Sequence, residues 1–449
     1  SPHVTRVSTG EEALALLARH RFDLVITMTR LGDMEATALA RAVKARHPEL
    51  PVVLLAFNSH ELARLSALAG PGGLDRVFLW SGDARILLAI IKNVEDLRNA
   101  EHDSREGDVR VILLVEDSVR FYSVYLPLLY TEVVEHTQAL LAEGLNLSHR
   151  LLRMRARPKI LLASSFEEAW DLYRRHRQYL LGVISDARFP REGRKEPEAG
   201  VEFLRRIKAD DPELPAALQS SEPGIAARAA EVGAAFIAKE SAHLLRDLRQ
   251  FLRDQLGFGD FVFRLPDGRE VARAGDLRTL TRLLAEVPDE SLLYHAGHDH
   301  FSNWLRARTE FALAAQIRPR KIDEFRDAGE LRRYLHETFA RFREEAQRGV
   351  VADFSRRLFD GGSDFVRIGG GSLGGKARGL AFMNSVLNRF GVGDRFPGVS
   401  IQVPPTAVVA TDVFDEFLEY PRLRRRLLGD ADDEQVAAAC LRAPLPRSV

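Results

Sequence analysis

The chain has 449 residues, a length typical of about three domains. Lys plus Arg and Asp plus Glu each total 64, so the formal net charge is zero and no overall positive field favours nucleic acid or an anionic membrane. Apolar residues make up 45% of the sequence, so we expect globular domains. The sequence contains neither a signal peptide nor a run of about 18 apolar residues, so we expect no membrane span. The single cysteine, Cys440, excludes an internal disulfide and favours a cytoplasmic location.

Residues 1–98 alternate between short apolar strands and amphipathic helices, a rhythm that predicts a parallel sheet covered on both faces. The polar stretch 101–110 is expected to be a linker. The expected strands are 3–7, 23–27, 51–57 and 76–80, and the expected helices are 10–21, 36–50 and 84–100.

Residues 109–257 repeat this rhythm, and two similar units in tandem are stronger evidence than either alone. The expected strands are 109–117, 159–164, 180–186, 214–218 and 234–239, with helical segments between them.

Polar side chains stand at the ends of these strands, where parallel α/β sheets bind their ligands. Glu116 and Asp117 follow the first strand, Asp186 ends the third, and Ser220 and Lys239 follow the fourth and fifth. Carboxylate oxygens suit Mg²⁺, and a carboxylate beside such a metal can attack phosphorus to form an acyl phosphate. The metal, the lysine and the hydroxyl would then offset charge on the transferring oxygens.

With these residues in place, 109–257 resemble a response-regulator receiver domain over essentially their whole length. Pro190 also fits, and Phe236 stands at the position of the family's switch aromatic. The resemblance implies a flavodoxin-like fold and phosphorylation of Asp186 by a histidine kinase or another phosphodonor. The implied metal ligands are Glu116, Asp117 and Asp186, and the implied catalytic set is Asp186, Ser220 and Lys239.

The segment departs from the family in three places, which concern partner surface and switching. The loop after Asp186 is longer than usual, and Glu240 replaces the proline that normally follows the lysine. Residues 121–158 exceed a first receiver helix and are expected to pack against the domain or form a homodimer, with a ligand site as the alternative. The alternative for the acids is that they are merely solvated strand ends.

At the equivalent positions, residues 1–98 carry none of these polar side chains, and the segment resembles a truncated pseudo-receiver. Met28 replaces the acceptor, Ala56 the hydroxyl residue and Trp80 the lysine, while the strand with the acidic pair would precede Ser1. We expect a scaffold or dimerisation role.

Residues 258–350 are expected to form a hairpin at 261–271 followed by helices at 276–287, 300–317 and 329–349. The segment His295–His300 contains possible metal ligands, but its spacing matches no zinc motif. The favoured interpretation is a loop before an apolar helix face, and the sequence leaves open whether Arg306 and Arg308 meet a phosphate or an acid. The candidate ligands are His295, His298, Asp299 and His300, and the apolar face is Phe301, Trp304, Leu305 and Phe311.

A glycine-rich loop follows residue 361. A G-x-G-x-x-G pattern begins at Gly369, and 370–376 fit a P-loop until Ala377 takes the place of the Ser or Thr that would bind Mg²⁺, so no Walker A site is expected. Backbone N–H groups followed by Lys376 at a helix start still favour a phosphate site, with a flexible linker as the alternative.

Two further segments, SLGGKARGLAFMN and VPPTAVVATDVFDEFLE, resemble the opening of the nucleotide-binding domain of phosphoenolpyruvate synthase and pyruvate phosphate dikinase. This resemblance covers about 365–420 and implies an ATP-grasp fold in which Gly374, Gly375 and Lys376 face the phosphates of ATP. The family's downstream arginines, metal-binding acids and phospho-carrier histidine domain are absent from the chain.

The expected fold is therefore α/β, with two tandem doubly wound parallel-sheet receiver domains, a mostly helical middle segment and the beginning of an ATP-grasp α+β domain. The predicted function is that of a phosphorylation-responsive N-terminal part of a dikinase-like phosphotransferase, incomplete as a catalyst and signalling to downstream phosphotransferase domains. The alternative is a non-enzymatic two-component adaptor; DNA binding is disfavoured because no helix-turn-helix with a basic face is found. The predicted domains are 1–98, 109–257, 258–350 and 361–449.

Overall fold

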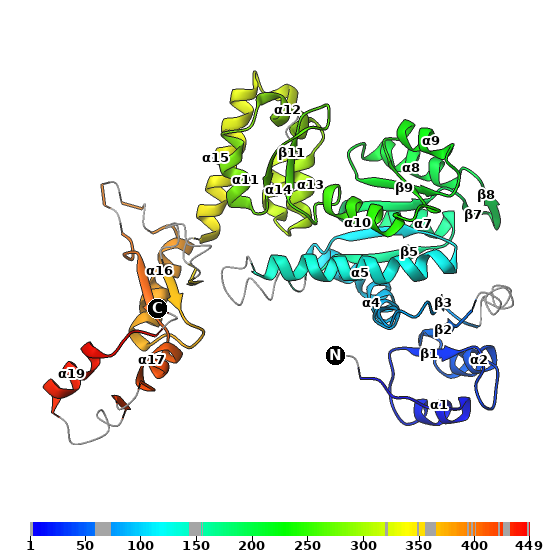
Figure 1. Ribbon diagram of the computed structural model, residues 1–449, viewed down its shortest axis with the longest axis horizontal. Helices are drawn as coiled ribbons and strands as arrows, with labels where there is room; N and C mark the ends of the chain where they lie inside the picture. The colour runs from blue at the N-terminus through cyan, green and yellow to red at the C-terminus, as the bar shows by residue number, and fades with distance from the viewer. Residues whose placement is uncertain are drawn as a thin grey trace. The chain divides into compact units, whose positions relative to one another are not determined.

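The computed structural model divides the chain into two compact units, and each is described by itself (Figure 1). The first unit contains 1–138, 155–276 and 287–324, and the second contains 139–154, 277–286 and 325–449. The described residues are 3–58, 73–142, 154, 156–318, 322–347, 350–354, 365–392, 395–396, 398–399, 401–420, 423–424, 432–446 and 449.

The first unit begins with a three-stranded parallel sheet in the order β1-β2-β3. Strand β2 lies in the middle and is buried at every position, which explains its unbroken apolar sequence. Helix α1 starts at a capping box in which Thr9 and Glu12 bond each other's backbone N–H groups. The strands are β1 (Val25–Met28), β2 (Val52–Ala56) and β3 (Arg76–Leu79), and the helices are α1 (Gly10–Leu17), α2 (Ala36–Arg46) and α4 (Arg85–Gly107).

A five-stranded parallel sheet follows, in the order β10-β9-β6-β4-β5. In chain order this is the 2-1-3-4-5 arrangement of flavodoxin-like folds, so the predicted receiver-type fold is confirmed. The strands are β4 (Val111–Val115), β5 (Lys159–Ala163), β6 (Leu180–Asp186), β9 (Ala216–Ser220) and β10 (Ala235–Ala238), and the helices are α5 (Val119–Ala142), α7 (Phe166–His176), α8 (Ala199–Asp210), α9 (Ile225–Glu231) and α10 (Leu244–Asp254).

The five-stranded sheet has a hydrophobic core on each face, because alternate strand residues point to opposite sides. In β4, Ile112 and Leu114 join the core beneath α5 and α10, while Val111, Leu113 and Val115 join the core beneath α7, α8 and α9. The first of these cores also contains apolar side chains of β2, β3 and α4, so α5 packs between the two sheets. The part of 121–158 that forms α5 therefore packs against the domain as expected, whereas 143–153 and 155 lie outside the described residues.

Two expectations for the start of the chain are wrong. Residues 3–7 form no strand: the equivalent strand β5 pairs only with β4, and the described part of the first sheet has no counterpart of β4. Residues 101–107 belong to α4 and are not a linker. Their polar sequence conceals a buried side, because Ser104 is 1% exposed and donates to the carbonyl of Val109, while Asp103 pairs with Lys159 at 2.7 Å.

The predicted hairpin is confirmed as β11 (Phe261–Arg264) and β12 (Glu270–Ala274), which pair antiparallel. The helix expected at 300–317 is two helices, α13 (His300–Ala307) and α14 (Phe311–Ile317), because the left-handed φ of +65° at Thr309 interrupts it. A short helix that the sequence analysis missed, α12 (Asp289–Gly297), precedes them.

The second unit contains helices and a small three-stranded parallel sheet in the order β13-β14-β15. Strand β15 lies in the segment VPPTAVVAT, and β14 was not among the strands expected from the sequence. Within the described residues, no helix has the length and apolar character needed to cross a membrane. The elements are α11 (Leu277–Leu284), α15 (Ala328–Gln347), β13 (Ala352–Asp353), β14 (Phe365–Ile368), α16 (Gly375–Arg389), β15 (Thr406–Val409), α17 (Thr411–Leu418) and α19 (Asp433–Arg442).

Candidate functional site

All five polar residues predicted for the receiver lie at one rim of the five-stranded sheet. Glu116 and Asp117 follow β4, Asp186 and Ser220 end β6 and β9, and Lys239 follows β10. They meet because parallel strands present their carboxyl ends at the same edge. The parallel pairing of β6 with β9 and of β9 with β10 fixes this alignment.

The three carboxylates form a group with the chemistry of a divalent cation site. One oxygen from each of Glu116, Asp117 and Asp186 lies within 4.8 Å of the others. Glu116 is fully buried and Asp186 is 7% exposed, so these negative charges are held largely out of water. Oxygen donors at this spacing fit Mg²⁺, which binds through a few carboxylates and keeps several waters.

Lys239 joins two of these acids. Its Nζ lies 2.7 Å from Oε2 of Glu116 and 2.7 Å from Oδ2 of Asp186, and its side chain is 5% exposed. The ring of Phe121 at the start of α5 lies beneath the ammonium group, 4.4 Å from Nζ to the ring centroid. This contact links the site to α5, and nothing in the order of polar residues along the strands predicted it.

Burial and crowding alter the acidity of the site. Burial, together with the charge of Asp186, raises the pKa of Glu116 to about 7 despite the opposing effect of Lys239. Burial also raises the pKa of Asp186, again against Lys239. Glu116 and Asp186 therefore hold protons more readily than free side chains do, and a bound divalent cation would favour their ionised forms.

Ser220 and its neighbours are held in place by backbone contacts. The hydroxyl of Ser220 accepts the N–H of Glu222 at 3.0 Å, and its carbonyl accepts the N–H of Lys239 at 2.9 Å. Because Oγ already accepts one hydrogen bond, the hydroxyl hydrogen remains for donation at the rim. Phe236 in β10 is partly buried against the core beneath α7, α8 and α9.

The longer loop after Asp186 forms a small hairpin, β7 (Phe189–Arg191) and β8 (Arg194–Glu196). Glu192 and Gly193 turn it with φ of +51° and +76°, the left-handed pair typical of a type I′ turn. Lys195 extends from β8 to the rim, where its Nζ lies 2.7 Å from Oδ2 of Asp117. No pattern in the sequence indicated this contact.

Gly200 at the start of α8 is a second residue that the sequence analysis missed. A Cβ atom there would lie 2.0 Å from the backbone oxygen of Asp186. Only glycine therefore allows α8 to begin this close to Asp186, and the N–H of Gly200 donates to the carbonyl of Ala187 at 3.0 Å.

The corresponding strand ends of the first sheet carry the residues named from the sequence. Met28 ends β1 with 49% exposure, Ala56 ends β2 fully buried, and Trp80 follows β3. In the described part of the chain, the group of Glu116, Asp117 and Asp186 is the metal-type cluster found.

The histidine segment is a structural network. Nε2 of His295 accepts the N–H of Arg264 at 2.7 Å, and its Nδ1 lies 2.9 Å from Nδ1 of His300, so both nitrogens of His295 are engaged and metal binding by this ring is disfavoured. Arg306 donates to the carbonyl of Leu180 at 3.0 Å, which is neither a phosphate nor an acid.

The remaining expectations for this segment are met in part. Arg308 donates to the carbonyl of Gly275 at 2.8 Å. Phe301, Trp304 and Leu305 are buried as predicted, whereas Phe311 begins the next helix and is only partly buried.

The glycine loop joins β14 to α16, with Gly374 as the N-cap and Lys376 exposed in the first helical turn. Two of its N–H groups are already in use: Gly370 donates to Oδ2 of Asp412 at 2.7 Å, and Ser372 donates to Oγ1 of Thr411 at 3.1 Å. The loop is thereby attached to α17.

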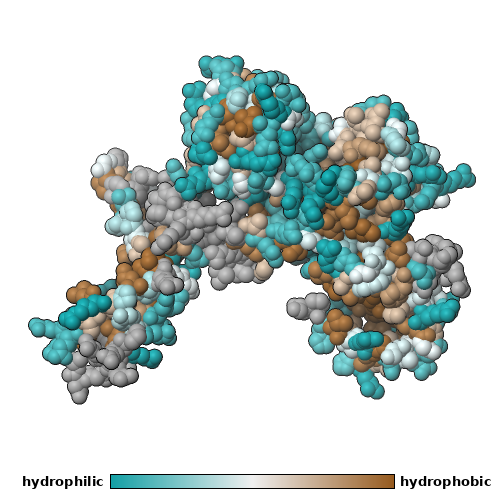
Figure 2. All heavy atoms as spheres, in the orientation of Figure 1, coloured by the Kyte–Doolittle hydropathy of each residue, from teal (hydrophilic) through white to brown (hydrophobic). Residues whose placement is uncertain are grey.

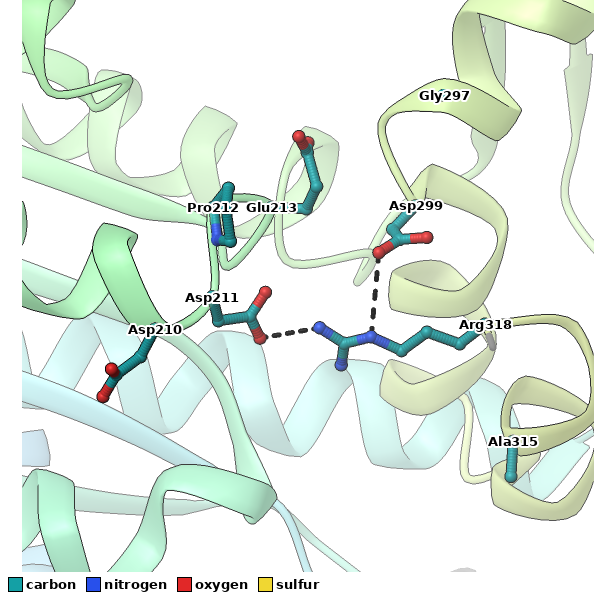
Figure 3. A pocket seen from close by; sticks show the side chains of 8 residues that line it. All are labelled: Asp210, Asp211, Pro212, Glu213, Gly297, Asp299, Ala315 and Arg318. Atoms are coloured by element: carbon teal, nitrogen blue, oxygen red, sulfur yellow. Dashed lines mark hydrogen bonds and ion pairs between the residues drawn. The ribbon is translucent and has the colours of Figure 1, made fainter. Parts of the chain in front are cut away.

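A cavity of about 700 Å³ lies against the loop between α8 and β9 (Figure 3). Arg318 crosses it, with Nη2 2.6 Å from Oδ2 of Asp211 and Nε 3.7 Å from Oδ2 of Asp299. This loop precedes β9, so the cavity lies near the amino ends of the strands, away from the carboxyl rim. The lining residues are Asp210, Asp211, Pro212, Glu213, Gly297, Asp299, Ala315 and Arg318.

No family model matches the chain. Over 63 residues, 14% of this chain, it is 36% identical to the DNA-binding transcriptional regulator NtrC of Salmonella typhimurium, and the match spans 13% of that protein. Two solved structures each match 55% of this chain and 85% of their own chain. One is a probable two-component system response regulator/GGDEF domain protein, with 18% identity and a TM-score of 0.24. The other is a putative protein of the same description, with 16% identity and a TM-score of 0.25. The chain is thus similar to response regulators over part of its length.

Proposed function

We propose that residues 109–257 form a receiver whose Asp186 accepts a phosphoryl group in the presence of Mg²⁺. The observation that carries this proposal is the grouping of three carboxylates within 4.8 Å, with Lys239 2.7 Å from Asp186. A histidine kinase or another phosphodonor would supply the phosphoryl group.

In the proposed transfer, a carboxylate oxygen of Asp186 attacks the phosphorus of a phosphohistidine or an acyl phosphate. A new P–O bond forms, and the bond to the donor breaks with its electron pair leaving on the donor. Bound Mg²⁺, held by Glu116, Asp117 and Asp186, would offset charge on the phosphoryl oxygens. Lys239 is placed to pair with one such oxygen, and the hydroxyl of Ser220 to donate to another.

The experiment is incubation of the chain with acetyl phosphate or beryllofluoride and Mg²⁺, followed by mass spectrometry and binding measurements. Wild type should be modified or occupied at Asp186, and residues 1–98 should carry no acyl phosphate because Met28 cannot form one. Asp186→Asn should abolish modification, whereas Asp171→Asn, at an exposed helix position, should leave it unchanged. Equal labelling of the Asp186→Asn variant would refute the proposal.

Phosphorylation would act by biasing Ser220 and Phe236 between two arrangements. The first unit of the chain supplies a contact route, since Phe121 lies beneath Lys239 while Tyr122, the next residue, bonds the carbonyl of Val77 in β3. In this scheme the pseudo-receiver is a scaffold that contacts the start of α5 and responds to changes there.

We also infer that the receiver regulates a dikinase-like phosphotransferase of which this chain is the N-terminal part. Support comes from Gly374, Gly375 and Lys376 at the start of α16, because a helix N-terminus that follows a parallel strand is a suitable place for the phosphates of ATP. The second unit also carries apolar side chains at its surface that further protein would cover (Figure 2). The most exposed aromatic examples are Phe382, Phe390 and Phe414, at 69%, 67% and 57%.

The alternative is a two-component adaptor that acts only through protein contacts. The coding sequence that follows Val449 would distinguish the dikinase-like enzyme from the adaptor. A remaining ATP-grasp half and a phosphohistidine domain there would support the enzyme, and their absence would support the adaptor.

A further inference from the structure

The hairpin β7–β8 brings a second lysine to the carboxylate rim. Lys195 Nζ lies 2.7 Å from Oδ2 of Asp117, while Lys239 Nζ lies at the same distance from Glu116 and Asp186. Each of the three carboxylates therefore has an ammonium partner, and Asp117 owes its partner to the inserted hairpin.

The two lysines differ in how firmly they are held. The side chain of Lys239 is 5% exposed, whereas that of Lys195 is 55% exposed. An exposed ion pair contributes little stability, because water screens it and a long side chain must be ordered. Lys195 is therefore the ammonium group that a stronger cation displaces first, and Asp117 is the carboxylate that this displacement leaves open to the cation.

We propose that Lys195 is the substitute cation of the metal-free site and that Mg²⁺ binding displaces it from Asp117. This inference rests on the proposed Mg²⁺ site. It makes Lys195 a residue that sets metal affinity, because the cation must break the Lys195–Asp117 pair and tolerate the remaining positive charge nearby. Metal binding also frees the hairpin from its attachment at the rim.

Isothermal titration of the whole chain with Mg²⁺ tests this inference. Lys195→Met should bind Mg²⁺ about fivefold more tightly than wild type, which corresponds to about 1 kcal/mol. Lys195→Arg, which keeps the charge, should stay close to wild type. Arg194→Met removes an exposed charge from the same strand without touching Asp117, so its affinity should also change little.

Hydrogen exchange supplies a readout that does not depend on affinity. In wild type, Mg²⁺ should speed amide exchange in 189–196, and in Lys195→Met exchange should already be fast without the metal. Asp117→Asn separates the two claims: if it leaves Mg²⁺ binding unchanged, the proposed metal site is wrong. If Asp117→Asn weakens binding but Lys195→Met binds as wild type does, the metal site stands and the role of Lys195 is overturned.

Discussion

Tyr122 in α5 donates its hydroxyl hydrogen to the backbone carbonyl of Val77 in β3. The next residue, Ser123, accepts the N–H of Leu79 at 2.9 Å, and the ring of Phe78 meets that of Tyr122 edge-on at 5.4 Å. Strand β3 is the edge of its sheet, so helix side chains here bond backbone groups that a further strand would otherwise pair. The two sheets of the first unit therefore share α5 as a common support.

The first prediction is that Tyr122→Phe destabilises this shared support. The substitution keeps the ring but removes the hydrogen bond to the buried strand, at an expected cost of about 1–2 kcal/mol in the free energy of unfolding. Urea denaturation followed by circular dichroism measures the change. Tyr179→Phe is the matched control, because no hydrogen bond of its hydroxyl is found among the described residues. Equal effects of the two substitutions would contradict the assigned role.

The residues at the rim of the receiver could be predicted from the sequence because parallel strands present their carboxyl ends at the same edge of the sheet. Once the strands are correctly placed, the residues that follow them must meet, and Glu116, Asp186 and Lys239 do. The linker expected at 101–110 failed for the opposite reason. Its polar composition indicated solvent, but Ser104 and Asp103 are polar residues that bond within the protein.

Contacts between distant segments were outside the reach of sequence patterns. Lys195 reaches Asp117 only because the turn at Glu192 folds the β7–β8 hairpin back across the rim. Asp412 contacts Gly370 across 42 positions of the chain, and no local periodicity encodes such a pair.

The second prediction concerns the buried histidine pair. Nε2 of His295 accepts the N–H of Arg264, so its hydrogen lies on Nδ1 and is donated to Nδ1 of His300. Burial, with the charges of His300 and Arg264, lowers the pKa of His295 to about 3, and burial lowers that of His300 to about 4. Both rings should therefore stay neutral at pH 5.

The sign of the stability effect follows from linkage. Both rings have lower pKa values in the folded protein than in the unfolded chain. Their contribution to the free energy of unfolding is therefore full above about pH 6.5 and is lost as pH falls toward about 4. Each ring should lower the free energy of unfolding by about 2 kcal/mol between pH 7 and pH 5. Long-range nitrogen–proton NMR, with the His295→Gln spectrum for assignment, should show the Nδ1–H form of His295 down to pH 5. A titration midpoint near 6.5 for that ring would contradict the network.

The last prediction is that this chain binds ATP weakly because the glycine loop already holds an internal anion. The N–H of Gly370 lies 2.7 Å from Oδ2 of Asp412, and the loop N–H groups lower the pKa of that carboxyl, as expected for a bound carboxylate. A phosphate must compete with this carboxylate and relies otherwise on the exposed Lys376, so we expect a Kd of roughly millimolar or weaker.

Calorimetry should show that Lys376→Ala abolishes ATP binding and that Asp412→Ala strengthens it by about threefold, since it frees N–H groups and removes a negative charge. Asp415→Ala, an exposed acid in the same helix, is the matched control and should have little effect. All three variants should leave phosphorylation of Asp186 unchanged, because that residue belongs to the other unit. Micromolar binding that survives Lys376→Ala would place the nucleotide elsewhere, and pyruvate-dependent ATP consumption by this chain would refute the proposal that it is only the regulatory part of an enzyme.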